Sequence, residues 1–212
     1  MKLISSLFEY LGIVILFINA LLFFKSYTSK KSMAFKYFTF YLATSLIIVV
    51  ITSTLSYFAE DNLYFSHFYF IGQFILLSLF YRELLNPSQK KIVNTVLILV
   101  LFILSLHYAN NPNLFFKFFV FEIFITSFPI VIYSIIHLYN SISKKGAYIY
   151  INAGILIYLT TSTLIFILGD YLSEYNNTTI KKIWLVNKIL YLIYLILIFI
   201  EWTKTLSMDK NK

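Results

Sequence analysis

The charged and polar residues of this chain are the ones that could carry chemistry, and they are few, because only 12% of its 212 residues are charged. Glu122 stands out, since it lies about 7 residues, or about 10 Å, inside the outer end of an apolar stretch. An ionised carboxylate without a partner is costly in a membrane, so Glu122 indicates a ligand site or a proton site. A structural interpretation stays open, in which Glu122 is protonated, or pairs with Lys188 or Asn187, and ties two helices together.

Other polar residues lie in the same outer half of the predicted structure and could line one pocket with Glu122. The candidate ligand-binding residues are Glu9, Gln73, Glu122, Asp170, Asn187 and Lys188. His67 and His107 lie at a similar depth, near helix ends. An enzyme would need two carboxyl groups beside a substrate bond, and this alternative would use Glu122 and Asp170 as its acid and base. We assign no other catalytic residue.

The residue types exclude several kinds of chemistry. The chain has no Cys, which removes disulfides, thiolate metal sites and cysteine nucleophiles. No pair of His residues has the spacing of metal ligands on a helix, so we predict neither a metal nor another cofactor. Lys188 lies about 5 residues from the predicted start of its helix, too shallow for a Schiff-base lysine of the retinal-protein kind. It could pair with Glu122 or extend to the interface.

Seven apolar stretches are long enough to hold these residues in a membrane. A helix rises about 1.5 Å per residue, so about 20 apolar residues cross a hydrocarbon core of about 30 Å. The sequence therefore predicts an all-α polytopic membrane protein, a compact bundle of seven transmembrane helices forming one domain over residues 1–212. The predicted spans are 7–24, 37–58, 64–81, 92–108, 115–139, 147–170 and 183–202. The short connections make neighbouring helices antiparallel.

Polar residues in these stretches recur at helical spacing, which predicts that they face the inside of the bundle. In the fifth stretch one face carries Glu122, Thr126, Pro129, Tyr133, His137 and Asn140. Steps of three and four keep such positions on one face of a helix. The inward candidates of the fourth stretch are Asn94, Ser105 and Tyr108, and those of the sixth are Asn152, Thr163 and Asp170.

The distribution of basic residues predicts the orientation of the bundle. Twelve of the 17 basic residues fall on one side, namely Lys25, Lys30, Lys31, Lys36, Arg82, Lys90, Lys91, Lys144, Lys145, Lys204, Lys210 and Lys212. Because basic residues gather on the cytoplasmic side, the amino terminus is predicted outside and the carboxy terminus in the cytoplasm. The net charge of +8 is spread over membrane-flanking loops, so we predict membrane lipids and no nucleic acid as partners, and the bacterial inner membrane as the location.

The last third of the chain carries a set of recognisable residues: the run from Gly154 to Tyr158, Phe166, Asp170-Tyr171-Leu172, and the run from Ile183 to Leu190. In these residues the chain, mainly over residues 150–205, resembles a family of small uncharacterised seven-helix membrane proteins of Bacteroidetes. Genes for such proteins often lie beside sensor histidine kinases. The resemblance therefore implies a sensory or accessory role.

Gly169 and Asp170 form a Gly-Asp pair at a predicted helix end. In this pair and in its length the chain also resembles the lysoplasmalogenase-like membrane enzymes. Those enzymes have eight helices and several membrane-embedded Asp residues, whereas this chain offers seven predicted helices and only Asp170. The resemblance implies hydrolysis of a lipid linkage.

Three functions follow as hypotheses. The first is a non-enzymatic sensory or accessory component that binds a small or lipid-derived signal and acts through a partner such as a sensor histidine kinase. Only ten residues follow Trp202, so we expect any signal to pass to a separate protein. The second is a membrane-embedded lipid hydrolase, and the third is a proton-coupled carrier of small molecules that uses Glu122.

Overall fold

The computed structural model describes residues 2–30, 32–143, 146–172 and 177–206, and this part of the chain forms seven α-helices. The helices are α1 (Lys2–Ser26), α2 (Met33–Tyr57), α3 (Phe65–Leu84), α4 (Pro87–Asn110), α5 (Val120–Ser143), α6 (Ile149–Leu172) and α7 (Asn177–Glu201). A 3-10 turn, Pro112–Phe116, precedes α5, and a π-helical turn, Trp202–Leu206, continues α7. The predicted all-α fold is confirmed.

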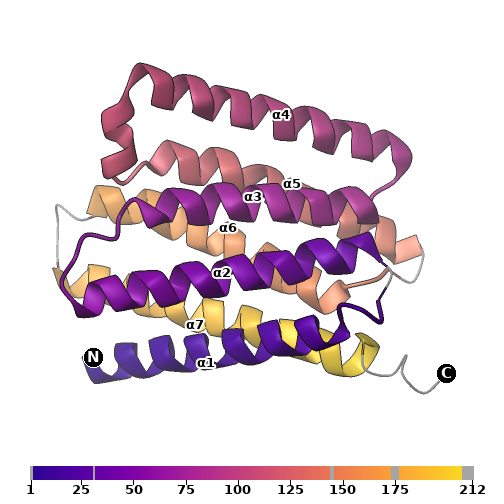
Figure 1. The fold of residues 1–212 in the computed structure, drawn as a ribbon, viewed down its shortest axis with the longest axis horizontal. Coiled ribbons are helices and arrows are strands. Elements are labelled where there is room, and N and C mark those ends of the chain that lie inside the picture. The colour runs from indigo at the N-terminus through magenta and orange to yellow at the C-terminus, as the bar shows by residue number, and fades with distance from the viewer. Residues whose placement is uncertain (1, 31, 144–145, 173–176, 207–212) are drawn as a thin grey trace.

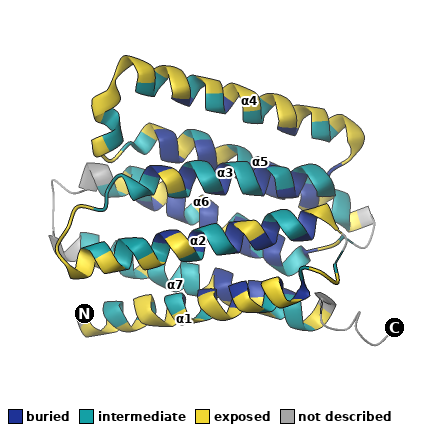
Figure 2. Ribbon diagram, in the orientation of Figure 1, coloured by how far each residue is buried: buried dark blue, intermediate teal, exposed yellow. Residues whose placement is uncertain are grey.

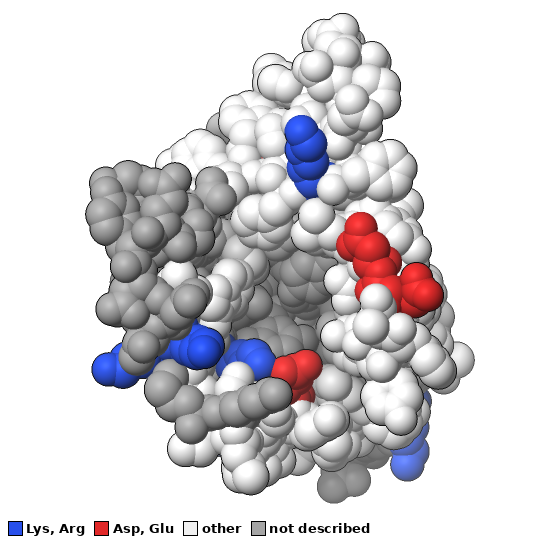
Figure 3. All heavy atoms as spheres, turned by 90° about the vertical axis from the view of Figure 1, so that its left-hand side faces the viewer, with Lys and Arg blue, Asp and Glu red and all other residues white. Residues whose placement is uncertain are grey.

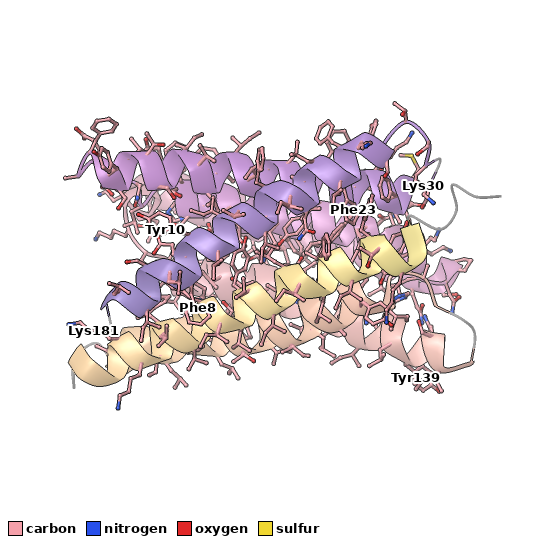
Figure 4. The ribbon with its side chains drawn as sticks, turned by 90° about the horizontal axis from the view of Figure 1, so that it is seen from below. Phe8, Tyr10, Phe23, Lys30, Tyr139 and Lys181 are labelled. Carbon is pink, nitrogen blue, oxygen red and sulfur yellow. The ribbon has the colours of Figure 1, made fainter. Side chains whose placement is uncertain are left out.

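The helices run alternately up and down along one long axis (Figure 1). We call the end at which α1, α3, α5 and α7 begin the amino-terminal end of the bundle, and the opposite end the carboxy-terminal end. Helices α5, α6 and α7 pack in sequence, α1 packs between α7 and α2, and α3 joins α2 to α5. Seen from below, α1 and α7 lie side by side with Phe8 between them (Figure 4).

Helix α4 lies at the edge of the bundle, packed mainly on α3 and α5, and it is exposed along most of its length (Figure 2). Two of its predicted inward residues, Asn94 and Ser105, are exposed, so that prediction is wrong. Tyr108 is half-buried. A helix at the edge buries one narrow face, and neither polar residue lies on that face.

Among the described residues, six helices are long and apolar enough to cross a membrane: all but α3. Large apolar side chains cover the outside of the bundle; Ile98, Phe102 and Leu164 are examples. Buried polar side chains lie inside it, as expected where the surroundings cannot form hydrogen bonds. The arrangement is compatible with a helical membrane bundle, and among the described helices α3 alone has no stretch apolar enough to count as a candidate span.

The predicted polar face of α5 is confirmed, since Glu122, Thr126, Tyr133 and His137 are all buried. The helix begins later than predicted, however, because residues 112–116 form a 3-10 turn and α5 starts at Val120. Glu122 is therefore in the first turn of α5 rather than about two turns inside it.

A polar node holds the middle helices together around Asn152 on α6. The Tyr81 hydroxyl on α3 donates to Asn152 Oδ1 at 2.8 Å, and the Ser134 hydroxyl on α5 donates to the same oxygen at 2.9 Å. The Asn152 amide donates in turn to the Ser134 carbonyl at 3.1 Å. Asn152 and Ser134 are fully buried. This node fixes α3, α5 and α6 to one another on the carboxy-terminal side of the cavity described next.

Candidate ligand-binding site

The larger cavity of the bundle has a volume of about 360 Å³ and lies between α2, α3, α5, α6 and α7. Its wall is mostly apolar, with tyrosines and uncharged polar side chains interspersed. The polar and tyrosine residues are Thr52, Asn62, Ser66, Tyr69, Gln73, Ser127, Tyr158, Ser162, Thr163 and Tyr191. None of the described lining residues carries a charge. This volume and composition are typical of a small-molecule site.

The cavity reaches from the amino-terminal end into the bundle. Asn62 and Leu63 of the α2–α3 connection and Phe118, just before α5, line it near that end. Gln73 lines it about 12 Å further along α3, at about 1.5 Å per residue from Phe65. The same end of the molecule is visibly hollowed (Figure 3). A ligand reaching this cavity from that end would pass between loops and not through the whole bundle.

Gln73 gives the cavity an unused hydrogen-bond acceptor. The residue is 4% exposed, and its Oε1 has no partner among the described residues. Buried polar atoms are nearly always hydrogen-bonded, so an orphaned carbonyl oxygen at a cavity wall indicates a missing donor. A ligand hydroxyl or amide would supply it once the Gln73 side chain turns this buried oxygen toward the cavity.

Tyr158 and Tyr191 form one wall of the cavity, and Tyr194 packs against both without lining the cavity itself. The rings of Tyr158 on α6 and Tyr194 on α7 stack at 5.4 Å with an interplanar angle of 4°, and Tyr191 lies 5.3 Å from Tyr158. Gly154 permits this stack, because a Cβ at that position would lie 2.7 Å from Tyr194 Cδ2. The wall is therefore built by the close approach of α6 and α7 and is aromatic with hydroxyl groups attached.

A second cavity of about 220 Å³ adjoins the first between α1, α2 and α7. The two cavities share Val49, Thr52 and Tyr191 in their walls. The second contains an ion pair in which Lys188 Nζ lies 2.7 Å from Glu9 Oε2. The same ammonium donates to the Ser5 hydroxyl at 3.0 Å. Among the described residues that line the two cavities, only Glu9 and Lys188 carry a charge.

Lys188 lies further along its helix than predicted. Helix α7 begins at Asn177, so Lys188 lies about 11 residues, or about 16 Å, along it. Because residues 177–179 are polar, hydropathy alone places the start of this helix too late. The Lys188 ammonium is held by Glu9 and Ser5 of α1.

Glu122 belongs to a separate polar cluster between α3, α4 and α5. His67 Nδ1 lies 3.1 Å from Glu122 Oε1 and 3.2 Å from Glu122 Oε2. The Tyr108 hydroxyl lies 2.9 Å from the same nitrogen and donates to Glu122 Oε2. Glu122 is 1% exposed and His67 2%. The Phe115 ring stacks on His67 at 5.4 Å and covers the cluster from the loop before α5.

The predicted pairing of Glu122 with Lys188 or Asn187 is therefore wrong. Glu122 is paired with His67 and Tyr108, on the α4 side of α3 and α5, and lines neither cavity. Sequence reasoning placed His67 at the right depth but did not select it or Tyr108 as partners of Glu122. Their positions near facing helix ends are the signal that could have found them.

Of the other predicted ligand-binding residues, some line a cavity and others do not. Gln73 lines the larger cavity, and Glu9 and Lys188 line the smaller one. Asn187 is half-buried with an unpartnered Oδ1 but lines neither cavity. The side chain of Asp170 lies outside the part of the chain that the structure describes. In that described part no three His, Cys, Asp or Glu side chains come together as metal ligands.

Comparison with known proteins gives no relative for the chain. No family model matches it, and neither a curated protein nor a solved structure matches it. The function must therefore be argued from the geometry of the two cavities and the polar cluster.

Proposed function

We propose that this chain is a membrane receptor component that binds a small amphipathic molecule in the larger cavity and passes the bound state to a partner signalling protein. The observation that supports the binding role best is the unpartnered Gln73 carbonyl in a cavity of about 360 Å³ with an otherwise largely apolar wall. Such a site suits an apolar chain with a single hydrogen-bond donor. The signalling role, with a sensor histidine kinase as the partner class, rests on the resemblance of residues 150–205.

The hydrolase and carrier alternatives have less support from the geometry. Both hypotheses use Glu122 as the group that transfers a proton. Glu122, however, lines neither cavity, and its carboxylate already contacts His67 and Tyr108. A general acid or a proton carrier must reach the bound molecule or the path that the molecule takes. The residues that do line the larger cavity are uncharged, which suits binding better than acid–base chemistry.

The binding proposal can be tested by tryptophan fluorescence in lipid nanodiscs. Trp184 lies 5.3 Å from Phe166, which lines the larger cavity, and Trp202 is the only other tryptophan. In a Trp202→Phe variant, 12-bromododecanol should quench Trp184 saturably, because a bound brominated chain comes close to the indole. Gln73→Met should weaken this binding about fivefold, the value of one neutral hydrogen bond of about 1 kcal/mol.

The matched control is Gln89→Met, which removes the other glutamine of the chain at the opposite end of the bundle. It should leave the affinity for the alcohol unchanged. Quenching of Trp184 that grows linearly with the probe, and equals that of Trp202 in a Trp184→Phe variant, would mean that the alcohol only dissolves in the bilayer. That result would overturn the binding role.

We further propose that all seven helices span the inner membrane, with the amino-terminal end outside. Helix α3 has 20 residues, a length of about 30 Å, which is enough to cross. It is less apolar because it lies inside the bundle, where Ser78, Gln73 and Tyr81 face other helices instead of lipid. The excess of basic residues at the carboxy-terminal end supports the orientation.

The absence of native Cys makes this topology directly testable. Single cysteines at exposed positions of the two ends, Glu60→Cys and Ser88→Cys, report each side of the membrane. A membrane-impermeant maleimide added to intact spheroplasts should label Glu60→Cys and leave Ser88→Cys unlabelled until the cells are lysed. The reverse pattern would invert the orientation, and labelling of both before lysis would mean that α3 does not cross.

A further inference from the structure

The ion pair between Lys188 and Glu9 is unequal, and this inequality has a functional meaning. The Lys188 side chain is 31% exposed and has two oxygen contacts, at 2.7 Å to Glu9 and at 3.0 Å to Ser5. The Glu9 side chain is 53% exposed. The ammonium is therefore the fixed member of the pair, whereas the carboxylate can turn into water at little cost. A charge this far along an apolar helix indicates a functional site.

The wall shared by the two cavities places this ammonium beside the larger, uncharged cavity. Val49, Thr52 and Tyr191 line both spaces. A molecule with its polar head at Lys188 can therefore lay its chain past Tyr191 toward Gln73. The two cavities together offer a charged subsite and an apolar subsite of the kind that a single-chain amphiphile needs.

The charge around the mouth favours an anion on this side. Lys181 and Lys182 are exposed near the start of α7, at the same end of the bundle. The acidic residues of the opposite rim, Glu60 and Asp61, lie on the α2–α3 connection. Figure 3 shows basic side chains and the basic–acidic pair on one side of the hollow, acidic side chains across it, and a further basic side chain above the acidic ones. An approaching anion would be drawn along α7 toward Lys188.

We propose that Lys188 is the head-group subsite of this cavity, and that the ligand is a single-chain amphiphile with one anionic head, a carboxylate or a phosphate, which takes the place of the Glu9 carboxylate on the ammonium. This inference rests on the proposed binding function and names its ligand class. The exchange replaces one anionic oxygen on Lys188 by another, so the ammonium is never left without a partner. The released Glu9 carboxylate is solvated, and the chain occupies the larger cavity.

The test compares three probes with the same chain, 12-bromododecanoate, 12-bromododecyl phosphate and 12-bromododecanol, by quenching of Trp184 in the Trp202→Phe protein in phosphatidylcholine nanodiscs. Each probe partitions equally into the bilayer for every variant, so the comparison is between variants. Lys188→Met should weaken binding of the anions at least tenfold and leave the alcohol unchanged. Lys188→Arg should retain the affinity for both anions. Glu9→Gln should strengthen their binding three- to tenfold, because the competing carboxylate is gone.

Lys91→Met, the same substitution at an exposed position of α4 at the opposite end of the bundle, is the matched control and should change anion binding less than twofold. Equal losses of alcohol and anions in Lys188→Met, or weaker anion binding in Glu9→Gln, would overturn the inference. If Lys188→Met fails to fold, Lys188→Arg and Glu9→Gln still decide it. A preference for one anion over the other identifies the head group as carboxylate or phosphate. If the alcohol binds saturably but neither Lys188→Met nor Glu9→Gln changes anion binding, the anionic head group is excluded while the binding function stands. If no probe binds saturably, the binding function itself is overturned.

Discussion

Replacing Glu122 with leucine should lower the free energy of unfolding by about 3–5 kcal/mol, the usual cost of removing one member of a buried pair. The substitution leaves His67 and the Tyr108 hydroxyl buried without their shared acceptor. It also releases the contact that holds the end of α4 against α3 and α5. Reversible unfolding in mixed micelles, followed by circular dichroism, measures the loss.

The Glu122→Gln variant separates the role of charge from that of hydrogen bonding. Its amide can still accept from Tyr108 and donate to His67, so the loss should be less than half that of Glu122→Leu. The double variant His67→Leu with Glu122→Leu should be more stable than the sum of the single losses predicts, because neither member of the His67–Glu122 pair is then left buried without the other; the Tyr108 hydroxyl loses both of its partners. If the two losses of unfolding free energy simply add, or if the Glu122→Leu protein is as stable as the parent, Glu122 is not hydrogen-bonded to His67 and Tyr108 as described.

The second large effect is expected at Asn152. Asn152→Leu removes the side-chain partner of Tyr81 and one of the two acceptors of Ser134 at the centre of three helices, and leaves the Ser134 hydroxyl its bond to the backbone carbonyl of residue 152. Single hydrogen bonds in membrane proteins average about 0.6 kcal/mol, but losing the three bonds of a fully buried side chain and leaving the Tyr81 hydroxyl unpaired should cost about 2–3 kcal/mol. The same unfolding measurement applies.

Asn94→Leu is the matched control for that experiment, because Asn94 is exposed on α4. In a membrane the change replaces a polar side chain facing outward by an apolar one, so stability should be unchanged or slightly higher. If the two variants lost equal stability, the assignment of Asn152 to an inner node and of α4 to the edge would both be wrong.

The sequence was sufficient to predict the helices, since each apolar stretch is long and the breakers between them are clear. Helix ends were less predictable, because hydropathy measures apolarity and not backbone conformation. Residues 115–119 are apolar apart from Lys117, yet Pro112–Phe116 form a 3-10 turn whose Phe115 covers His67. Residues 177–179 are polar, yet they form the first turn of α7.

The members of the candidate site were predictable only in part. Gln73 lines the larger cavity and Glu9 and Lys188 line the smaller one, whereas Glu122 and Asn187 line neither. Helical spacing correctly placed Glu122 on the inward face of α5, because that rule depends on one helix alone. The partners of Glu122 and Lys188 depend on how neighbouring helices rotate and tilt, which no single stretch encodes. The larger cavity is formed by apolar residues, tyrosines and uncharged polar residues of five helices, and their meeting could not be read from spacing.

The position of a bound brominated chain tests the central claim most directly. A crystal structure of the protein grown with 12-bromododecanol, with anomalous scattering measured at the bromine edge, locates the halogen without assumptions about the ligand. We expect one ordered bromine peak inside the bundle, within the cavity lined by Gln73, Tyr158 and Phe166. Bromine found only around the apolar outer surface of the helices, with that cavity filled by protein side chains, would contradict it.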